Sequence, residues 1–466
     1  IDKDLCTGCR ECSKVCPVNA IEGEEGKPQE INLDRCVMCG QCVQTCKSYA
    51  SVIDEGFEFL QEKKQEREIP ESINEPIFAA YNVCDIDKVK KALSDPNVFT
   101  MVQCAPAVRV ALGEDFGYYL GYLGAGKMAA ALRALNFDRV YDTNFAADLT
   151  IMEEGSELIK RVTEGGTLPM FTSCCPAWVK FMEKNYPKLT NHLSSCKSPQ
   201  QMGGAIFKTY GAEINNVDAS KIFSVSIMPC TCKKYECDRE EMDSSGYRDV
   251  DVVLTTRELA YLIKDMGIDF KNLREEKFDS PLGSYSGAGT IFGVTGGVME
   301  AAIRTGYELI TGESIPDVEV KQVRGENGFR KSTIKIGDLD LRVGVVSGLK
   351  NVIPVLEDLE KGKLDVDFIE VMTCPVGCVS GGGQPKILLE EYKELAYENR
   401  TKATYVHDEH LAIRKSHENP DLQAIYKDFF GEPNSDVAHK YLHTHYFDKS
   451  CVYGECPQEC ACEEAK

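Results

Sequence analysis

Cysteine spacing constrains this chain more than any other feature of its sequence. Eight of the 22 cysteines fall within the first 46 residues, in two runs that share the spacing C-x2-C-x2-C-x3-C. The first run is Cys6, Cys9, Cys12 and Cys16, and the second is Cys36, Cys39, Cys42 and Cys46. Three thiolates on one tight loop can cap three corners of an iron–sulfur cube, and the fourth reaches a neighbouring cube. The N-terminal segment is therefore expected to fold around two close clusters.

This doubled spacing is the signature of bacterial ferredoxins with two [4Fe–4S] clusters. We assign one cluster to Cys6, Cys9, Cys12 and Cys46. We assign the other to Cys36, Cys39, Cys42 and Cys16. Zinc knuckles are the alternative, but two four-cysteine runs at matched spacing favour iron and sulfur. The pattern predicts an α+β ferredoxin-like domain over residues 1–56 that carries electrons.

Length, charge and hydropathy exclude several classes of protein. A chain of 466 residues is too long for one core and predicts several domains. The net charge of −21 argues against nucleic-acid binding, which needs clustered Lys and Arg. No apolar run reaches the ~18 residues that a membrane span requires. Tight C-x-x-C spacing, with no leader in front of Ile1, indicates reduced thiolates in the cytoplasm rather than a secreted disulfide scaffold.

The rest of the chain alternates between helix-like and strand-like segments. Residues 57–80 are rich in charge and predict a short helix and a linker. Beyond them, residues 127–135 have helical periodicity, and residues 223–228 and 341–346 are apolar strand candidates. This alternation predicts an α/β domain over residues 81–448, followed by a cysteine-rich tail over 449–466. The glycine-rich stretch near residue 290 lacks G-x-G-x-x-G spacing, so nucleotide binding is only weakly indicated.

Three further motifs bring cysteines from separate segments. They are Thr172-Ser173-Cys174-Cys175-Pro176-Ala177-Trp178, Met228-Pro229-Cys230-Thr231-Cys232-Lys233-Lys234-Tyr235-Glu236, and the stretch from Glu370 through Cys374 and Cys378 to Gly381-Gly382-Gly383-Gln384-Pro385. Four of these thiolates could close one cube at an interface between lobes. Buried free cysteines that only pack are the alternative.

These motifs resemble the signatures of the [FeFe]-hydrogenase catalytic domain over about residues 80–448. The resemblance implies an α+β ferredoxin-like N-terminal domain joined to a two-lobed α/β hydrogenase catalytic domain. It implies a [4Fe–4S] cube linked through one cysteine to a two-iron unit with carbonyl, cyanide and a bridging dithiolate. The implied cube ligands are Cys175, Cys230, Cys374 and Cys378, with Cys378 bridging to the two-iron unit.

The resemblance also implies the residues around this cluster. Lys233 would donate a hydrogen bond to one cyanide, and Met228 and Met372 would line an apolar pocket. Pro106 and Ala107 resemble the stretch whose backbone meets the other cyanide. Many relatives have Ser at the position of Ala107, so that side-chain hydrogen bond is absent here. Phe292 and Gln200 are expected to pack against the residues that contact the cluster and to hold them in place.

A proton path is implied as well. Cys174 resembles the proton-donating thiol of the family, and a thiol titrates close enough to neutral pH for such a relay. Glu154 and Glu157 lie three residues apart on one helical face, and Ser194 and Arg161 complete the path. Without the motif, the two glutamates would be interpreted as solvated surface charges.

The cysteines and histidines outside the motifs fall into two sets, those expected to be structural and four cysteines in the tail. Cys84, Cys104, Cys196, Cys232 and Cys237 are expected to pack in the core, and the seven histidines to be structural. The tail has the spacing C-x4-C-x3-C-x-C, formed by Cys451, Cys456, Cys460 and Cys462. These four thiolates could bind a further [4Fe–4S] cluster, with zinc or disulfides as alternatives.

The leading functional hypothesis is an oxidoreductase that interconverts dihydrogen with protons and electrons. The rival is a hydrogenase-like iron–sulfur scaffold or sensor without turnover. The expected electron partner is an iron–sulfur subunit or ferredoxin, leading to a formate dehydrogenase or a nicotinamide-reducing module. A monomer with a frayed tail is the alternative to such a complex.

Overall fold

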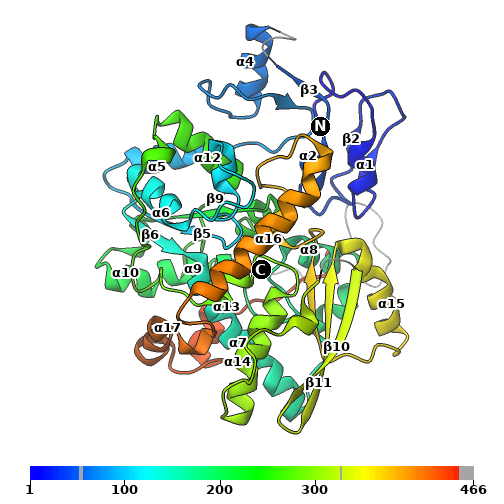
Figure 1. Cartoon of the computed structure of the whole chain (residues 1–466), viewed down its shortest axis with the longest axis vertical. Helices are drawn as coiled ribbons and strands as arrows, with labels where there is room; N and C mark the ends of the chain where they lie inside the picture. The colour runs from blue at the N-terminus through cyan, green and yellow to red at the C-terminus, as the bar shows by residue number, and fades with distance from the viewer. Residues whose placement is uncertain (52–55, 326–327, 451–466) are drawn as a thin grey trace, which may run out of the picture.

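Two four-stranded sheets form the framework of the large domain (Figure 1). The structure, a computed structural model, describes residues 1–51, 56–325 and 328–450. The tail cysteines Cys451, Cys456, Cys460 and Cys462 lie outside the described residues. One sheet forms the core of each lobe, as the two-lobed α/β prediction requires.

The first sheet is entirely parallel, in the order β6-β5-β8-β9. Its strands are β5 (Phe99–Cys104), β6 (Arg139–Asp142), β8 (Ile222–Met228) and β9 (Val252–Thr255). Strand β8 confirms the strand expected over residues 223–228. Strands β5 and β8 are almost wholly buried, as in a parallel sheet covered on both faces. The surrounding helices are α5 (Ile86–Ser94), α6 (Ala125–Ala134), α9 (Pro199–Phe207), α10 (Tyr210–Ile214), α11 (Cys232–Cys237) and α12 (Thr256–Asp265).

The second sheet is mixed, in the order β10-β11-β12-β7. Its strands are β7 (Met170–Phe171), β10 (Gly328–Ile336), β11 (Leu339–Ser347) and β12 (Phe368–Met372). A two-residue turn joins β10 to β11, and Gly337 supplies the positive φ of 59° that such a turn needs. Strand β11 contains the strand expected over residues 341–346. Three helices pack in this lobe: α8 (Pro176–Asn185), α14 (Gly297–Thr311) and α15 (Ile353–Glu360).

Helix α7 (Thr143–Glu164) connects the lobes. It packs against α9 of the first lobe and against α13 (Gly287–Ile291) and α14. The side chain of its N-cap residue, Asp142, accepts a hydrogen bond from the backbone N–H of Asn144. Half of α7 is buried, so its side chains can reach the interior between the sheets.

The N-terminal domain holds short elements between its cysteine runs. These are α1 (Glu11–Val15), β1 (Ile21–Glu22), β2 (Glu30–Ile31), α2 (Gln41–Thr45) and β3 (Tyr49–Ala50). Residues 57–80, expected to be a helix and linker, do form a helix, α4 (Phe57–Glu66). The remainder folds back onto the domain, because β4 (Ile77–Phe78) pairs with β3 and the buried Arg67 pairs with Asp2 at 2.6 Å.

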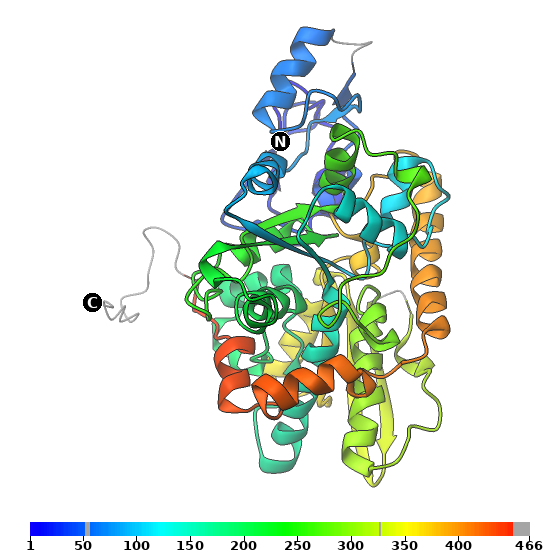
Figure 2. The ribbon, with the colours of Figure 1, turned by 90° about the vertical axis from the view of Figure 1, so that its left-hand side faces the viewer.

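A C-terminal segment of helices crosses the surface of both lobes (Figure 2). It contains α16 (Lys393–His410), α17 (Pro420–Ile425), a π-helical turn (Tyr426–Phe430) and α18 (Asp436–Leu442). Buried ion pairs hold it in place. Arg400 pairs with Glu114 at 2.5 Å, and Arg304 pairs with Asp408 at 2.8 Å.

At one point the backbone of the N-terminal domain lies directly against the backbone of the large domain. A Cβ atom at Gly382 would lie 2.4 Å from the carbonyl oxygen of Cys39 and 2.6 Å from the Cα of Gly40. This contact leaves no room for a methyl group.

We expect Gly382→Ala to force the two domains apart and to lower the free energy of unfolding by about 1–3 kcal/mol. Thermal melting followed by circular dichroism measures the change. Gly306→Ala is the matched control, because no atom lies within 4 Å of its Cβ position in the interior of α14. The control should be neutral or stabilising by about 0.5–1 kcal/mol. Equal melting of both variants would contradict the close contact.

Candidate metal centre and proton path

Five cysteines line one cavity where the two sheets meet. Cys174 and Cys175 follow β7, Cys230 follows β8, and Cys374 and Cys378 follow β12. Strand β5 ends beside the same cavity, with Ala105, Pro106 and Ala107 at its wall. These strands are parallel to their neighbours, so their carboxyl ends open towards one crevice, where ligands bind in α/β sheets.

The seven residues expected around the cluster all line this cavity: Pro106, Ala107, Gln200, Met228, Lys233, Phe292 and Met372. Among the residues that line the cavity, Lys233 is the one with a charged side chain. The remaining wall is mostly apolar, which lowers the local dielectric and strengthens each electrostatic contact.

Lys233 is fixed by a hydrogen-bond network. Its Nζ donates to the backbone oxygen of Cys174 at 3.1 Å and to Oε2 of Glu236 at 2.8 Å. Burial lowers the pKa of Lys233, but the charge and hydrogen bond of Glu236, together with the charges of Cys230 and Cys174, raise it above its usual value. Ser198 and Gln200 also donate to Glu236, at 2.9 and 3.0 Å. Glu236 closes the second cysteine motif, but no role was predicted for it. Its place three residues after Lys233 on α11 puts both side chains on one face of the helix.

The thiols of the cavity need a compensating positive charge. Burial raises the pKa of Cys230 to about 11 and that of Cys378 to about 12, and it raises the pKa of Cys374 further. Charges on neighbouring cysteines raise these values as well. Bound iron would supply the charge that converts such thiols to thiolates. This donor set therefore fits an iron–sulfur cube.

The N-terminal cysteines fall into two electrostatic groups. Burial raises the pKa of Cys12, and charges on Cys46, Cys6 and Cys9 add to the increase. Burial likewise raises the pKa of Cys39, with added charges from Cys42, Cys36 and Cys16. The two groups contain the same cysteines as the two expected ligand sets, although a charge on Cys12 also acts on Cys42. The ligand assignment itself stays a prediction.

Backbone N–H groups point at the sulfurs of both groups. The hydrogen bonds, with N···S distances of 3.2–3.4 Å, run from Ala20 to the sulfur of Cys16, from Met38 to that of Cys36, from Gln29 to that of Cys6 and from Ala80 to that of Cys46. Such hydrogen bonds favour thiolate ligands and tune cluster potentials.

The second group lies against the cavity. Nε2 of Gln41 donates to the sulfur of Cys374 at 3.4 Å, and Oγ1 of Thr231 donates to the backbone oxygen of Met38 at 2.7 Å. Of the eight N-terminal cysteines, all of them described, only Cys9 is exposed. The first group is therefore the one nearer to solvent.

The four residues expected beyond Cys174 form a path along α7. Glu154 is buried, and neither of its carboxylate oxygens has a hydrogen-bond partner among the described residues. Burial, together with the Glu157 charge, raises the pKa of Glu154 to about 8. Oγ of Ser194 donates to Oε2 of Glu157 at 2.9 Å. Nη2 of Arg161 donates to Oε1 of Glu157 at 2.5 Å, near the surface.

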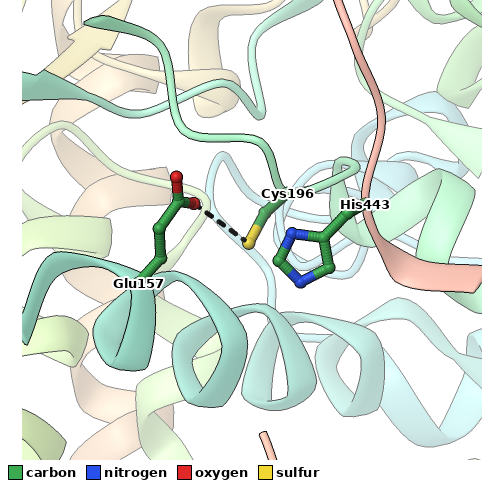
Figure 3. Close-up of side chains that lie close together, drawn as sticks. All are labelled: Glu157, Cys196 and His443. Carbon is green, nitrogen blue, oxygen red and sulfur yellow. Dashed lines mark hydrogen bonds between the residues drawn. The ribbon is translucent and has the colours of Figure 1, made fainter. Parts of the chain in front are cut away.

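Three residues near this path were missed. The Cys196 thiol donates to Oε2 of Glu157 at 3.8 Å, and His443 lies beside both side chains (Figure 3). The hydroxyl of Tyr446 donates to the backbone oxygen of Ser194. No spacing rule connects residues 157, 196 and 443, so only the fold could reveal them. The other unassigned cysteines, Cys84, Cys104, Cys232 and Cys237, are buried, as expected of packing residues.

Family models account for most of the chain. Residues 98–382 match the C-terminal domain of the iron-only hydrogenase large subunit. Residues 393–449 match the iron hydrogenase small subunit, and residues 1–47 match a 4Fe-4S dicluster domain. Among the described residues, no helix combines the length and the apolar character that crossing a membrane would require.

Similar proteins agree with these models. The NADP-reducing hydrogenase subunit HndD of Solidesulfovibrio fructosivorans is 46% identical over 90% of this chain and 74% of its own length. Iron hydrogenase 1 of Clostridium pasteurianum is 41% identical over 91% of this chain and 76% of its own length. The solved apo [FeFe]-hydrogenase HydA1 of Chlamydomonas reinhardtii superposes with a TM-score of 0.68 at 41% identity, covering 78% of this chain and 99% of that one. The chain therefore belongs to the iron-only, or [FeFe], hydrogenase family.

Proposed function

We propose that the chain interconverts dihydrogen with protons and electrons in the cavity between the two sheets. The observation that carries this proposal is the convergence of five thiols from three segments beside one buried ammonium group. Cys175, Cys230, Cys374 and Cys378 would hold the cube, and the thiolate of Cys378 would also tie the two-iron unit to the protein. When bound, this cluster would supply the redox chemistry that interconverts protons and dihydrogen.

Lys233 and the apolar wall hold the two-iron unit. The Lys233 ammonium, held by Glu236, would donate a hydrogen bond to a cyanide ligand of this unit. The backbone at Pro106 and Ala107, which also lines the cavity, would contact the other cyanide. Met228, Met372 and Phe292 exclude water, and Gln200, through its hydrogen bond to Glu236, supports Lys233.

Protons move along α7 between the cavity and the surface. Burial raises the pKa of the Cys174 thiol, so its sulfur holds a proton at neutral pH. Glu154, with a pKa of about 8, re-protonates the thiol. The hydroxyl of Ser194 donates to Glu157 and also acts on the Glu154 carboxyl, so it lies on the route between the two glutamates. Arg161 orients the Glu157 carboxylate at the outer end.

Electrons follow the N-terminal clusters. With the clusters bound, electrons would enter near the exposed Cys9, pass from the first cysteine group to the second, and reach the cavity near the contact between Gln41 and Cys374. We propose an iron–sulfur subunit or ferredoxin as the partner at this end, within a cytoplasmic complex. The similarity to an NADP-reducing hydrogenase subunit favours a nicotinamide-reducing module over a formate dehydrogenase.

The matured protein should evolve and consume dihydrogen and show infrared bands of bound carbonyl and cyanide. Cys378→Ser should lose both sets of bands, because the covalent link to the two-iron unit is gone, while iron in the N-terminal clusters remains. Infrared spectroscopy and a gas assay measure these outcomes. Unchanged bands in Cys378→Ser would contradict its bridging role, and a wild type with bands but no turnover would favour the scaffold hypothesis.

Glu154→Gln and Glu157→Gln keep the side-chain shape but cannot carry a proton. Dihydrogen turnover should fall by about 10²–10⁴-fold at constant iron content. In the wild type, Glu154 is protonated below pH 8, so evolution should decline as the pH rises through about 8, and Glu154→Gln should lack this inflection. Glu164→Gln, at the exposed end of the same helix, is the control and should be fully active. A normal rate in Glu154→Gln would remove it from the path.

The tail cysteines are proposed to bind a further [4Fe–4S] cluster, which extends the electron path to a partner subunit. Replacing Cys451, Cys456, Cys460 and Cys462 by Ser should remove about four iron atoms per chain. Iron analysis against the wild type measures the loss, with infrared bands as the control for an intact active site. Equal iron in the two proteins would exclude a tail cluster.

A further inference from the structure

A half-buried lysine of the large domain reaches into the N-terminal domain. Lys386 directly follows the glycine-rich stretch 381–385 that ends the third cysteine motif. Its Nζ donates to the backbone oxygen of Cys46 at 2.5 Å and to that of Val43 at 3.0 Å. Both oxygens lie at the C-terminal end of α2, where the helix dipole favours a cation. Lys386 thus places a positive charge next to a predicted cluster ligand of the other domain.

The contacts of Lys386 leave its charge uncompensated. The ammonium group lies over the ring of Phe78, with Nζ 3.4 Å from the ring centroid. No carboxylate of the described residues forms an ion pair with Lys386, and its two hydrogen-bond acceptors are neutral carbonyl groups. Its charge can therefore act on the cysteines beside it.

Lys386 interacts electrostatically with a cysteine of each expected ligand set. Burial lowers the pKa of Lys386 to about 7, while charges on Cys46, of the first set, and Cys42, of the second, raise it. Such an interaction is reciprocal, so the ammonium group also stabilises negative charge on both cysteines. Arg257 and Lys393 are the other charged groups that act on Lys386, and both are cations. With iron bound, all ligand cysteines are thiolates, and their charge favours the ammonium form.

We propose that the Lys386 ammonium group raises the reduction potential of the N-terminal clusters, and of the first cluster most. The inference rests on the proposed clusters of this domain. Each electron that the partner protein gives up adds one negative charge to the cluster that accepts it, and a nearby buried cation favours this reduced form. A residue of the large domain thereby sets the energy at which electrons enter through the N-terminal domain.

Lys47 carries the same charge next to the same cysteine but faces water. It directly follows Cys46, is exposed, and its Nζ lies 3.9 Å from Oε2 of Glu390. Water screens an exposed charge more strongly than a charge held at a contact between domains. We therefore expect Lys47 to have little effect on the clusters, which makes it a matched control for Lys386.

Lys386→Met tests the proposal, because methionine keeps an unbranched side chain against Phe78 but carries no charge. Redox titration followed by electron paramagnetic resonance should give more negative midpoint potentials for the N-terminal clusters than in the wild type, at equal iron content. Lys386→Gln, which can still donate to one carbonyl oxygen, should shift them in the same direction. Lys386→Arg keeps the charge at any pH and should have wild-type potentials. Lys47→Met should also match the wild type.

The arginine variant separates charge from packing. Unchanged potentials in both neutral variants would overturn the inference, and so would equal shifts in Lys386→Met and Lys386→Arg, since packing and not charge would then be responsible. A shift in Lys47→Met as large as that in Lys386→Met would also contradict it. A wild type without reduced N-terminal cluster signals would instead refute the proposed clusters themselves.

Discussion

Burying several cysteine thiols at one point is the constraint on which the rest of the structure depends. Neither Cys230 nor Cys378 can ionise at neutral pH in its buried position, because burial raises their pKa values far above neutrality. A metal cluster removes this penalty, so metal binding and folding around the cavity are thermodynamically linked. Both sheets direct the carboxyl ends of parallel strands at the cavity, and α7 joins the lobes behind it.

The proposed routes for electrons and for protons reach the cavity from different sides. The N-terminal domain meets it at backbone contacts around Gly40 and Gly382, where missing side chains allow the closest approach. The proposed proton path leaves along α7, where burial and the Glu157 charge raise the pKa of Glu154 to about 8. Lys233 lies between the two routes and does not titrate near neutral pH, because Glu236 keeps it charged.

The sequence predicted which cysteines and surrounding residues would gather at the cavity, but not the side chains beside Glu157. Cysteine spacing is local, so the two N-terminal groups and the three motif segments could be placed before any fold was known. Strands such as β8 and β11 were found because apolar runs mark buried strands. The return of residues 57–80 onto the N-terminal domain was not foreseen, because charge suggested a linker while Arg67 and Lys63 in fact pair with Asp2. Cys196 and His443 were interpreted as structural, since contacts between residues 247 positions apart leave no trace in local spacing.

Arg400 attaches the C-terminal segment to the part of the chain that surrounds the cavity. Its guanidinium pairs with Glu114, donates to the backbone oxygen of Val379 at 2.9 Å and reaches that of Pro385 at 3.3 Å, in the stretch that follows Cys378. The family model names this segment a small subunit, yet here it is covalently joined to the catalytic domain. Covalent joining replaces a bimolecular encounter by an intramolecular one at high effective concentration. In the fused chain, the contact between the C-terminal segment and the catalytic domain therefore does not depend on protein concentration. Weak interactions such as those of Arg400 are enough to keep the segment bound.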